Sequence, residues 1–350
     1  MGGWCGLWLA GCLWLAGVAM PALAVTPPLY EAEVAVKDQS VAARGPALRE
    51  ALTEVLIRLS GDRDLVRQPG VAALLAQADS HVQQYGYRPA PADARDPGAP
   101  WRLRVRFDGG GLERALRDLG LPFWGGERPE TLVWLAVEQP GQRQLLGETD
   151  ATEVKDGLLS TARHRGLPLI FPLLDLEDRA RVSFSDVWGG FLEPVLEASR
   201  RYRPQALLIG RLHQSGSGAW QASWILRLQD SEQRWSGSAT EPGALAAEGM
   251  GRVADELAAR FAVVDTGGAG GRLRITVAGV TDTGDYARLN RYLASLSALQ
   301  SAQLQTLAGD RAEYLLELQG DASGFERVLT LGSVLRADPD AGPRHYRLQP

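Results

Sequence analysis

The sequence predicts a multidomain protein of mixed α/β and α+β class. Strands that alternate strictly between apolar and polar residues occur in the first part of the chain, continuous apolar runs lie in the middle, and amphipathic helical stripes separate them. The chain has 350 residues, of which 45% are hydrophobic and 23% charged. This is the composition of a globular protein, and the length suffices for two or three domains.

The first residues have the pattern of an export signal. No charged side chain precedes Glu31, and the apolar run from residue 7 to residue 20 is 14 residues long. That is short for a membrane-spanning helix, which needs roughly 20 apolar residues. Ala22-Leu23-Ala24 is a small-x-small pattern, so we predict a signal peptide over 1–24 with cleavage after Ala24. Two alternatives stay open, a lipoprotein anchored at Cys12 and an uncleaved anchor.

Charge and cysteine content exclude several classes of protein. The net charge is −5, without the clustered basic surplus of a nucleic-acid-binding protein. Both cysteines, Cys5 and Cys12, lie in the predicted signal. The mature chain would therefore have no disulfide, no thiolate nucleophile and no cysteine-ligated metal.

A small α+β domain is predicted over 25–128. A strand alternates from Tyr30 to Val36, and a helix with one apolar stripe ends near Gly61. After a Pro/Ala/Asp loop at 89–100, a second alternating strand over 101–107 turns three arginines to one side: Arg102, Arg104 and Arg106. This stripe could bind an acidic partner or a phosphate, but pairing with Glu31 and Glu33 on a neighbouring strand is the favoured interpretation.

The segment 129–264 is predicted to be a three-layer α/β domain. The runs "TLVWLAV", "LPLIF" and "QALLIGRL" suit strands of a mostly parallel sheet that is buried on both faces. Helices are expected between them, the second either broken near Pro194 or split in two. A turn at 215–218 opens an antiparallel extension, and a helix that ends near Phe261 closes the domain.

The last part of the chain predicts a third domain. Residues 265–271 are Gly-rich and read as a linker. Over 272–338 the order β-α-β-β-α-β predicts a ferredoxin-like fold. Residues 339–350 are expected to form a flexible tail, although a final strand at 346–348 is considered.

The sequence contains no recognised catalytic signature. Nucleophile-elbow, P-loop and metalloprotease motifs are absent, and the four histidines are scattered singly. We therefore predict no catalytic residue, no metal site and no cofactor.

One acidic cluster follows the "LPLIF" run, with Asp175, Asp178 and Asp186. Ligands of open α/β sheets bind beyond the carboxyl ends of strands, so these carboxylates could hold a cation or act as a base. Alternatively, Asp175 caps a turn and Asp178 pairs with Arg179 or Arg181.

Three more residues complete the candidate interaction site. Arg200 and Arg201 end a helix, where the helix dipole favours cations, and they could also pair with the acidic loop. Trp188 is interpreted as a packing residue, with stacking on a ligand as the alternative.

Several motifs resemble a known family when they are taken in order. They are "LYEAEVAV", the helix that ends "VLIRLSG", "PLLDLED", "ASRRY" and "LLIGRL". They resemble the bacterial family named domain of unknown function 2066, over most of the mature chain. The resemblance implies an exported protein of Gram-negative bacteria and supplies no catalytic residues. The domain arrangement is more loosely similar to periplasmic adaptors, namely the amino-terminal domain of the Tol-system propeller protein, the flagellar T-ring accessory protein and penicillin-binding-protein activators.

The leading functional hypothesis is a non-enzymatic periplasmic adaptor that binds envelope proteins, with no nucleic-acid partner and no membrane contact beyond its signal. The second hypothesis is a divalent-cation-dependent hydrolase that uses Asp175, Asp178 and Asp186. The third is a small-ligand-binding protein with a crevice near Trp188.

Overall fold

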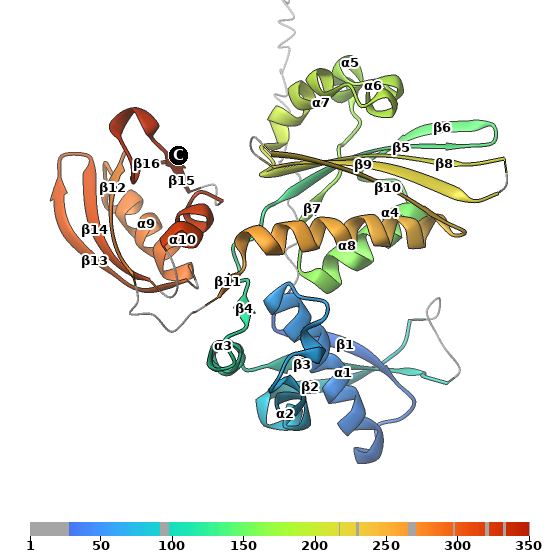
Figure 1. The fold of residues 1–350 in the computed structure, drawn as a ribbon, viewed down its shortest axis with the longest axis horizontal. Helices are drawn as coiled ribbons and strands as arrows, with labels where there is room; N and C mark the ends of the chain where they lie inside the picture. The colour runs from blue at the N-terminus through green and yellow to red at the C-terminus, as the bar shows by residue number, and fades with distance from the viewer. Residues whose placement is uncertain are drawn as a thin grey trace, which may run out of the picture.

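The computed structural model is a mixed α/β protein with four sheets. It describes residues 28–91, 98–216, 218–228, 231–264, 271–296, 298–318, 322–331 and 334–349. The predicted signal with Ala24 and Cys12 lies outside these ranges, as does all but the last residue of the predicted linker. Separate hydrophobic cores define an amino-terminal, a middle and a carboxy-terminal domain (Figure 1).

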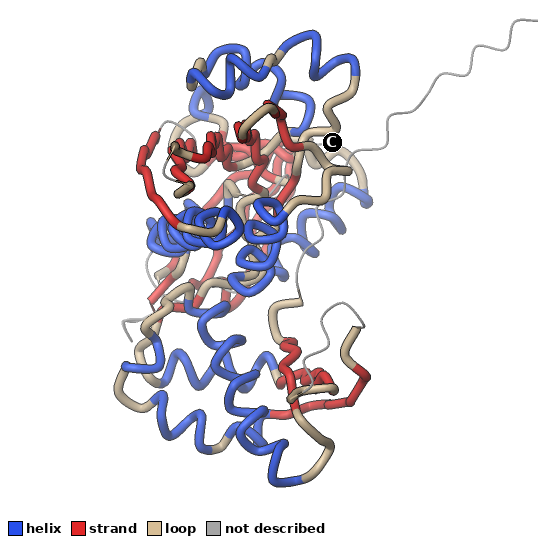
Figure 2. Tube along the Cα trace, turned by 90° about the vertical axis from the view of Figure 1, so that its right-hand side faces the viewer, coloured by secondary structure: helices blue, strands red, loops and turns tan. Residues whose placement is uncertain are grey.

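The amino-terminal domain packs helices on one face of a three-stranded antiparallel sheet in the order β1-β3-β2 (Figure 2). The predicted first strand, long helix and second strand are all present. The elements are β1 (Glu31–Val36), α1 (Val41–Ser60), η1 (Leu65–Arg67), α2 (Val71–Ala76), η2 (Ala78–His81), β2 (Val82–Pro89), β3 (Trp101–Phe107) and α3 (Gly109–Asp118).

Local sequence explains the bounds of α1. The Ser40 side chain accepts a hydrogen bond from the Ala43 amide and caps the start of the helix. Gly61 ends it with φ 73°, a left-handed conformation that glycine adopts readily. The apolar stripe of α1 is buried against the sheet, with Leu52 and Leu56 fully inaccessible.

Two arginines of the β3 stripe pair with Glu31 within the sheet, as the favoured interpretation predicted, whereas Glu33 pairs with an arginine of β2 instead. Glu31 of β1 accepts hydrogen bonds from Arg104 at 2.5 Å and from Arg106 at 2.7 Å. Glu33 pairs with Arg88 of β2 at 2.7 Å. These cross-strand pairs lie on the face opposite the core.

The middle domain has three layers (Figure 1). Helices α4 and α8 cover one face of the sheet, and α5, α6 and α7 cover part of the other. The elements are β5 (Thr131–Gln139), β6 (Gln142–Leu146), α4 (Glu153–Arg165), β7 (Leu169–Ile170), α5 (Leu176–Arg181), α6 (Phe184–Gly189), α7 (Leu192–Ser199), η4 (Arg200–Tyr202), β8 (Ala206–Gln214), β9 (Trp220–Leu228), β10 (Ser231–Ala239) and α8 (Pro242–Phe261).

The three apolar runs form β5, β7 and β8, which pair in parallel as predicted, and β9 and β10 form the predicted antiparallel extension. The antiparallel strand β6 was not predicted, and with it the sheet is no longer mostly parallel. The order is β10-β9-β8-β5-β6, and β7 pairs with the start of β5. Only β5–β8 and β5–β7 are parallel, because β6, β9 and β10 are each reached by a hairpin. The second helical segment is split in two, which is one of the two predicted alternatives. Gly190, with φ 69°, caps the end of α6, and Pro194 is tolerated in the first turn of α7.

The carboxy-terminal domain has the predicted β-α-β-β-α-β order but a different ending. Its strand order is β13-β14-β12-β16-β15. In a ferredoxin-like sheet the strand after the second helix would lie beside the first strand. Here β16 takes that place and runs parallel to β12, while β15 is displaced to the edge. The elements are β12 (Arg272–Ala278), α9 (Thr283–Ser295), β13 (Leu299–Ala308), β14 (Arg311–Leu318), α10 (Ala322–Leu329), β15 (Leu335–Ala337), η5 (Pro339–Ala341) and β16 (His345–Leu348).

The prediction of a flexible tail at 339–350 is therefore wrong for its second half. Residues 345–348 form β16, and Tyr346 and Leu348 are buried in the core of the domain. The physical reason is that Tyr346 and Leu348 alternate with exposed Arg347, which is the pattern of a half-buried strand.

Three buried arginines join the amino-terminal and middle domains. Arg128, 8% exposed, donates to the carbonyl oxygens of Arg58, Trp124 and Arg165 at 2.7–2.8 Å. Arg58 donates to the His164 carbonyl at 3.1 Å, and Arg165 donates to the Gly61 carbonyl at 2.6 Å. These donors and acceptors come from both domains, so the junction is a buried hydrogen-bond network.

A short two-stranded sheet completes this junction. It pairs β4 (Pro122–Phe123), from the end of the amino-terminal domain, with β11 (Val263–Val264), which follows α8. Close packing of α1 against α8 adds to it, because a Cβ atom on Gly61 would lie 2.3 Å from the Ala258 side chain.

Candidate functional site

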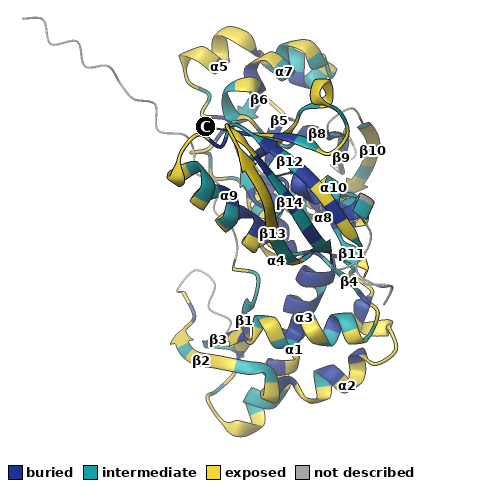
Figure 3. Cartoon of the chain, turned by 90° about the vertical axis from the view of Figure 1, so that its left-hand side faces the viewer, coloured by how far each residue is buried: buried dark blue, intermediate teal, exposed yellow. Residues whose placement is uncertain are grey.

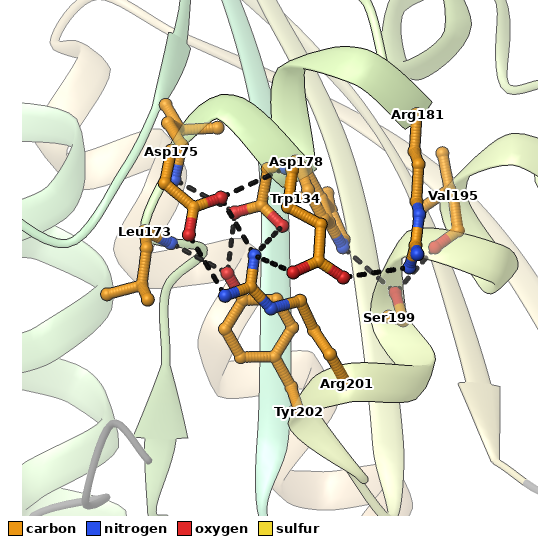
Figure 4. Close-up of polar contacts among 11 residues, drawn as sticks. Trp134, Leu173, Asp175, Asp178, Arg181, Val195, Ser199, Arg201 and Tyr202 are labelled. Atoms are coloured by element: carbon orange, nitrogen blue, oxygen red, sulfur yellow. Dashed lines mark hydrogen bonds and ion pairs between the residues drawn. The ribbon is translucent and has the colours of Figure 1, made fainter. Parts of the chain in front are cut away.

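The acidic loop after β7 is closed by an arginine and a tyrosine (Figure 4). Arg201 forms a two-pronged ion pair with Asp175, with nitrogen–oxygen distances of 2.8 and 2.9 Å. It also donates to Asp178 at 3.2 Å. Asp178, which is fully buried, accepts further hydrogen bonds from the Tyr202 hydroxyl at 2.6 Å and from the Leu174 amide at 2.9 Å.

The same cluster fixes the start of α5. The Asp175 side chain accepts a hydrogen bond from the Asp178 amide at 3.0 Å, which caps the helix. The Tyr202 hydroxyl accepts one from the Leu173 amide at 2.9 Å. The contacts tie the loop to η4 at the end of α7, so the arrangement acts as a structural clamp.

Electrostatics agree with this geometry. The hydrogen bond from Arg201 holds the pKa of Asp175 down at about 2, and the Asp178 amide adds to the effect. Asp175 in turn raises the pKa of Arg201. Burial, followed by the hydrogen bond to Asp178, raises the pKa of Tyr202. At neutral pH the ion pair between Asp175 and Arg201 is therefore fully charged.

This pairing predicts an acid-dependent loss of stability. The folded pKa of Asp175 lies below the value of roughly 3.9 expected in an unfolded chain. The contribution of the Asp175–Arg201 ion pair to the free energy of unfolding is therefore complete above about pH 4 and disappears as the pH falls toward 2. Urea unfolding between pH 5 and pH 2 should show a shallower loss for Asp175→Asn than for the wild type. Equal slopes for the two proteins would contradict the assignment.

Asp186 and Arg200 do not join the cluster. Asp186 forms a capping box with Ser183 at the start of α6, and the Ser183 hydroxyl donates to it at 2.6 Å. This hydrogen bond lowers the pKa of Asp186. Arg200 pairs with Glu197 at 2.6 Å and is largely exposed. Of the six predicted site residues, the structure brings together Asp175, Asp178 and Arg201.

The described ranges hold no group of three or more His, Cys, Asp or Glu side chains arranged to bind a metal ion.

Trp188 packs as predicted, and it also borders a crevice. Its ring stacks on Phe184 with centroids 5.4 Å apart, and its edge meets the His213 ring at 5.9 Å. Beside it, a cavity of about 360 Å³ lies between α6 and strands β8, β9 and β10. Arg211 and Arg234 line this crevice.

A larger cleft lies between the amino-terminal and middle domains. Its volume is about 1010 Å³, and its walls are the charged face of the β1-β3-β2 sheet and the α4–β7 segment. The α4–β7 wall carries apolar side chains, among them Leu159 and Leu169. Six cationic side chains and four carboxylates line the cleft: Arg58, Arg88, Arg102, Arg104, Lys155, Arg163, Glu31, Glu33, Glu54 and Glu148.

Lys155 anchors one side of this cleft. It is 6% exposed, and its ammonium donates to the carbonyl oxygens of Gly147, at 2.9 Å, and Glu148. The Phe171 ring lies 4.9 Å from the nitrogen. Burial lowers the pKa of Lys155. These contacts hold the β6–α4 loop in place, so the role of Lys155 is structural.

Sequence reasoning missed the interdomain cleft. Its lining comes from segments more than 100 residues apart, such as Glu31 and Arg163. The arginine stripe of β3 is the one sequence feature that could have indicated the cleft, because it predicts a charged sheet face that the middle domain could cover.

A comparison with protein families matches the amino-terminal part of the chain. Residues 24–125 match a domain of unknown function (DUF8605). The matched family is uncharacterised, as the motifs predicted. It is not the family that those motifs resemble, and the match covers the amino-terminal domain instead of most of the chain. No curated protein matches the chain.

Among the described residues, no helix combines the length and the hydropathy that crossing a membrane requires.

Proposed function

We propose that this protein is an exported, non-enzymatic adaptor that binds other proteins of the cell envelope. The observation that carries the proposal is the cleft of about 1010 Å³ between two domains that buried arginines hold together. Binding sites occur preferentially at such domain interfaces. Its volume is at the upper end of the roughly 300–1,000 Å³ typical of small-molecule pockets, so it has room for a segment of a partner protein.

The state of the acidic loop supports a non-enzymatic protein. A hydrolase would need a carboxylate that is available to a cation or to a water molecule. Asp175 and Asp178 are instead held by Arg201 and Tyr202, and Asp186 by Ser183. The loop exposes Leu173 and Leu176, and Leu176 is 87% accessible.

Export to the periplasm is part of the proposal. The uncharged apolar start of the sequence and the Ala22-Leu23-Ala24 pattern support it. The family match begins at residue 24, at the predicted cleavage site. The likeness to domain of unknown function 2066 beyond residue 125 belongs to the proposal as well.

The crevice beside Trp188 favours a second candidate, the binding of a small ligand. Its volume of about 360 Å³ lies within the range of small-molecule pockets, and it combines aromatic and arginine side chains.

Crosslinking in intact cells tests the adaptor. A tagged chain would be crosslinked and purified, and its intact mass would be measured in the same run. We expect a defined protein partner above background and a mass that fits cleavage after Ala24. A chain recovered without any protein partner would contradict the adaptor. A lipidated Cys12 would contradict the proposed localisation but not the binding function.

A further inference from the structure

The interdomain cleft carries an excess of positive charge in a negatively charged protein. Six cations and four carboxylates line it, whereas the net charge of the chain is −5. Glu31 is shared by Arg104 of the cleft lining and by Arg106, which lies outside the lining. Arg163 is exposed on α4 and has no ion-pair partner among the described residues. An anionic ligand would therefore be attracted to the cleft.

The backbone of β1 adds a second recognition element. The Ala32 side chain is buried in the opposite face of the sheet, so Ala32 can line the cleft only through its backbone. The sheet order places β1 at an edge. Exposed edges of this kind pair with added strands.

Strand alternation shows which groups this edge presents. The Tyr30 carbonyl accepts a hydrogen bond from the Phe107 amide on β3, so the polar backbone groups of the next residue point away from β3. The Glu31 carbonyl accordingly bonds to Arg58 at 2.6 Å. Because alternate residues of a strand turn their polar backbone groups to the same side, the amide and carbonyl of Glu33 also point away from β3, toward the open edge of the sheet. The backbone of an extended peptide could form hydrogen bonds with these two groups, whereas a small anion has no backbone to pair with them.

We infer that the cleft binds an extended acidic peptide segment of a partner protein. The acidic side chains meet Arg104 and Arg163, apolar side chains meet Leu159 and Leu169 on the opposite wall, and the peptide backbone pairs along β1. This inference rests on the proposed adaptor function and adds the site and the partner chemistry to it.

Peptide binding to the purified protein tests the inference. The probe is a short peptide in which Leu alternates with Glu, carrying a neutral dye, and binding is followed by fluorescence anisotropy. We expect binding that weakens with added salt, and a peptide with Lys in place of Glu should bind at least about tenfold more weakly. Arg163→Glu should weaken binding of the acidic peptide by about tenfold. Arg291→Glu, the same change at an exposed site of α9, should have no effect.

Several results would overturn the inference. They are no binding of the acidic peptide, equal binding of the lysine peptide, or the same effect of Arg163→Glu and Arg291→Glu. Complete displacement of the peptide by an equal concentration of inorganic phosphate would show a simple anion site instead. The inference and the adaptor function can fail separately. If a partner is captured in cells and Arg163→Glu does not weaken its binding, the adaptor function is supported but the cleft is not its binding site.

Discussion

Replacing Arg128 with alanine is expected to lower the free energy of unfolding by about 3–5 kcal/mol. Arg128 donates to four carbonyl oxygens, including that of Gly125 at 3.0 Å, and its guanidinium lies 4.3 Å from the Trp124 ring. Truncation would leave these buried acceptors without donors. Burial, followed by repulsion from Arg58, lowers the pKa of Arg128 to about 9, so the side chain is still charged at neutral pH.

Urea unfolding measures this loss by comparing the free energies of unfolding of Arg128→Ala and of the control variant Arg291→Ala. Arg291 is an exposed residue of α9, and its truncation should change stability by less than about 0.5 kcal/mol. Arg128→Lys keeps the charge but loses the forked donor geometry, so it should fall between the wild type and Arg128→Ala. A loss below about 1 kcal/mol for Arg128→Ala would show that the junction does not depend on this network.

Replacing Asp178 with alanine is the second large expected effect, again about 3–5 kcal/mol. The substitution would leave the Tyr202 hydroxyl and the Leu174 amide without their acceptor and would remove one partner of Arg201. Asp186→Ala removes one half of the capping box that Ser183 forms at the start of α6, and it should cost only about 1 kcal/mol.

The Asp178 comparison separates a structural role from a catalytic one. If Asp178 is structural, Asp178→Ala lowers the unfolding midpoint, and partner capture persists wherever the variant is still folded. If the variant keeps wild-type stability but no longer captures the partner, the cluster is functional and the clamp interpretation is wrong.

Strong local patterns predicted most elements of the fold. The alternating strands β1 and β3 and the capped helix α1 follow from side-chain periodicity and from Gly61. Strand β2 was missed because it is mainly exposed, as Figure 3 shows, and exposed edge strands have no apolar alternation to detect. The position of β16 depends on pairing with β12, a contact across some 70 residues of sequence.

The candidate site was only partly predictable. The pairing of Arg201 with the acidic loop was anticipated because both segments are short, charged and close to strand ends. Nothing local distinguishes the buried Arg58, Arg128 and Arg165 from surface arginines, since their burial comes from the packing of two domains. The cleft shares this origin, and for that reason it could not be derived from any one segment.

Photocrosslinking from the cleft in living cells tests the central claim most directly. A photoreactive amino acid would be placed at position 163 on the cleft wall, or at position 291 on α9 as the control. The account predicts a crosslink to one defined partner protein from position 163 and none from position 291. No crosslink from position 163 in a folded chain, or the same products from both positions, would contradict an adaptor that binds through its interdomain cleft.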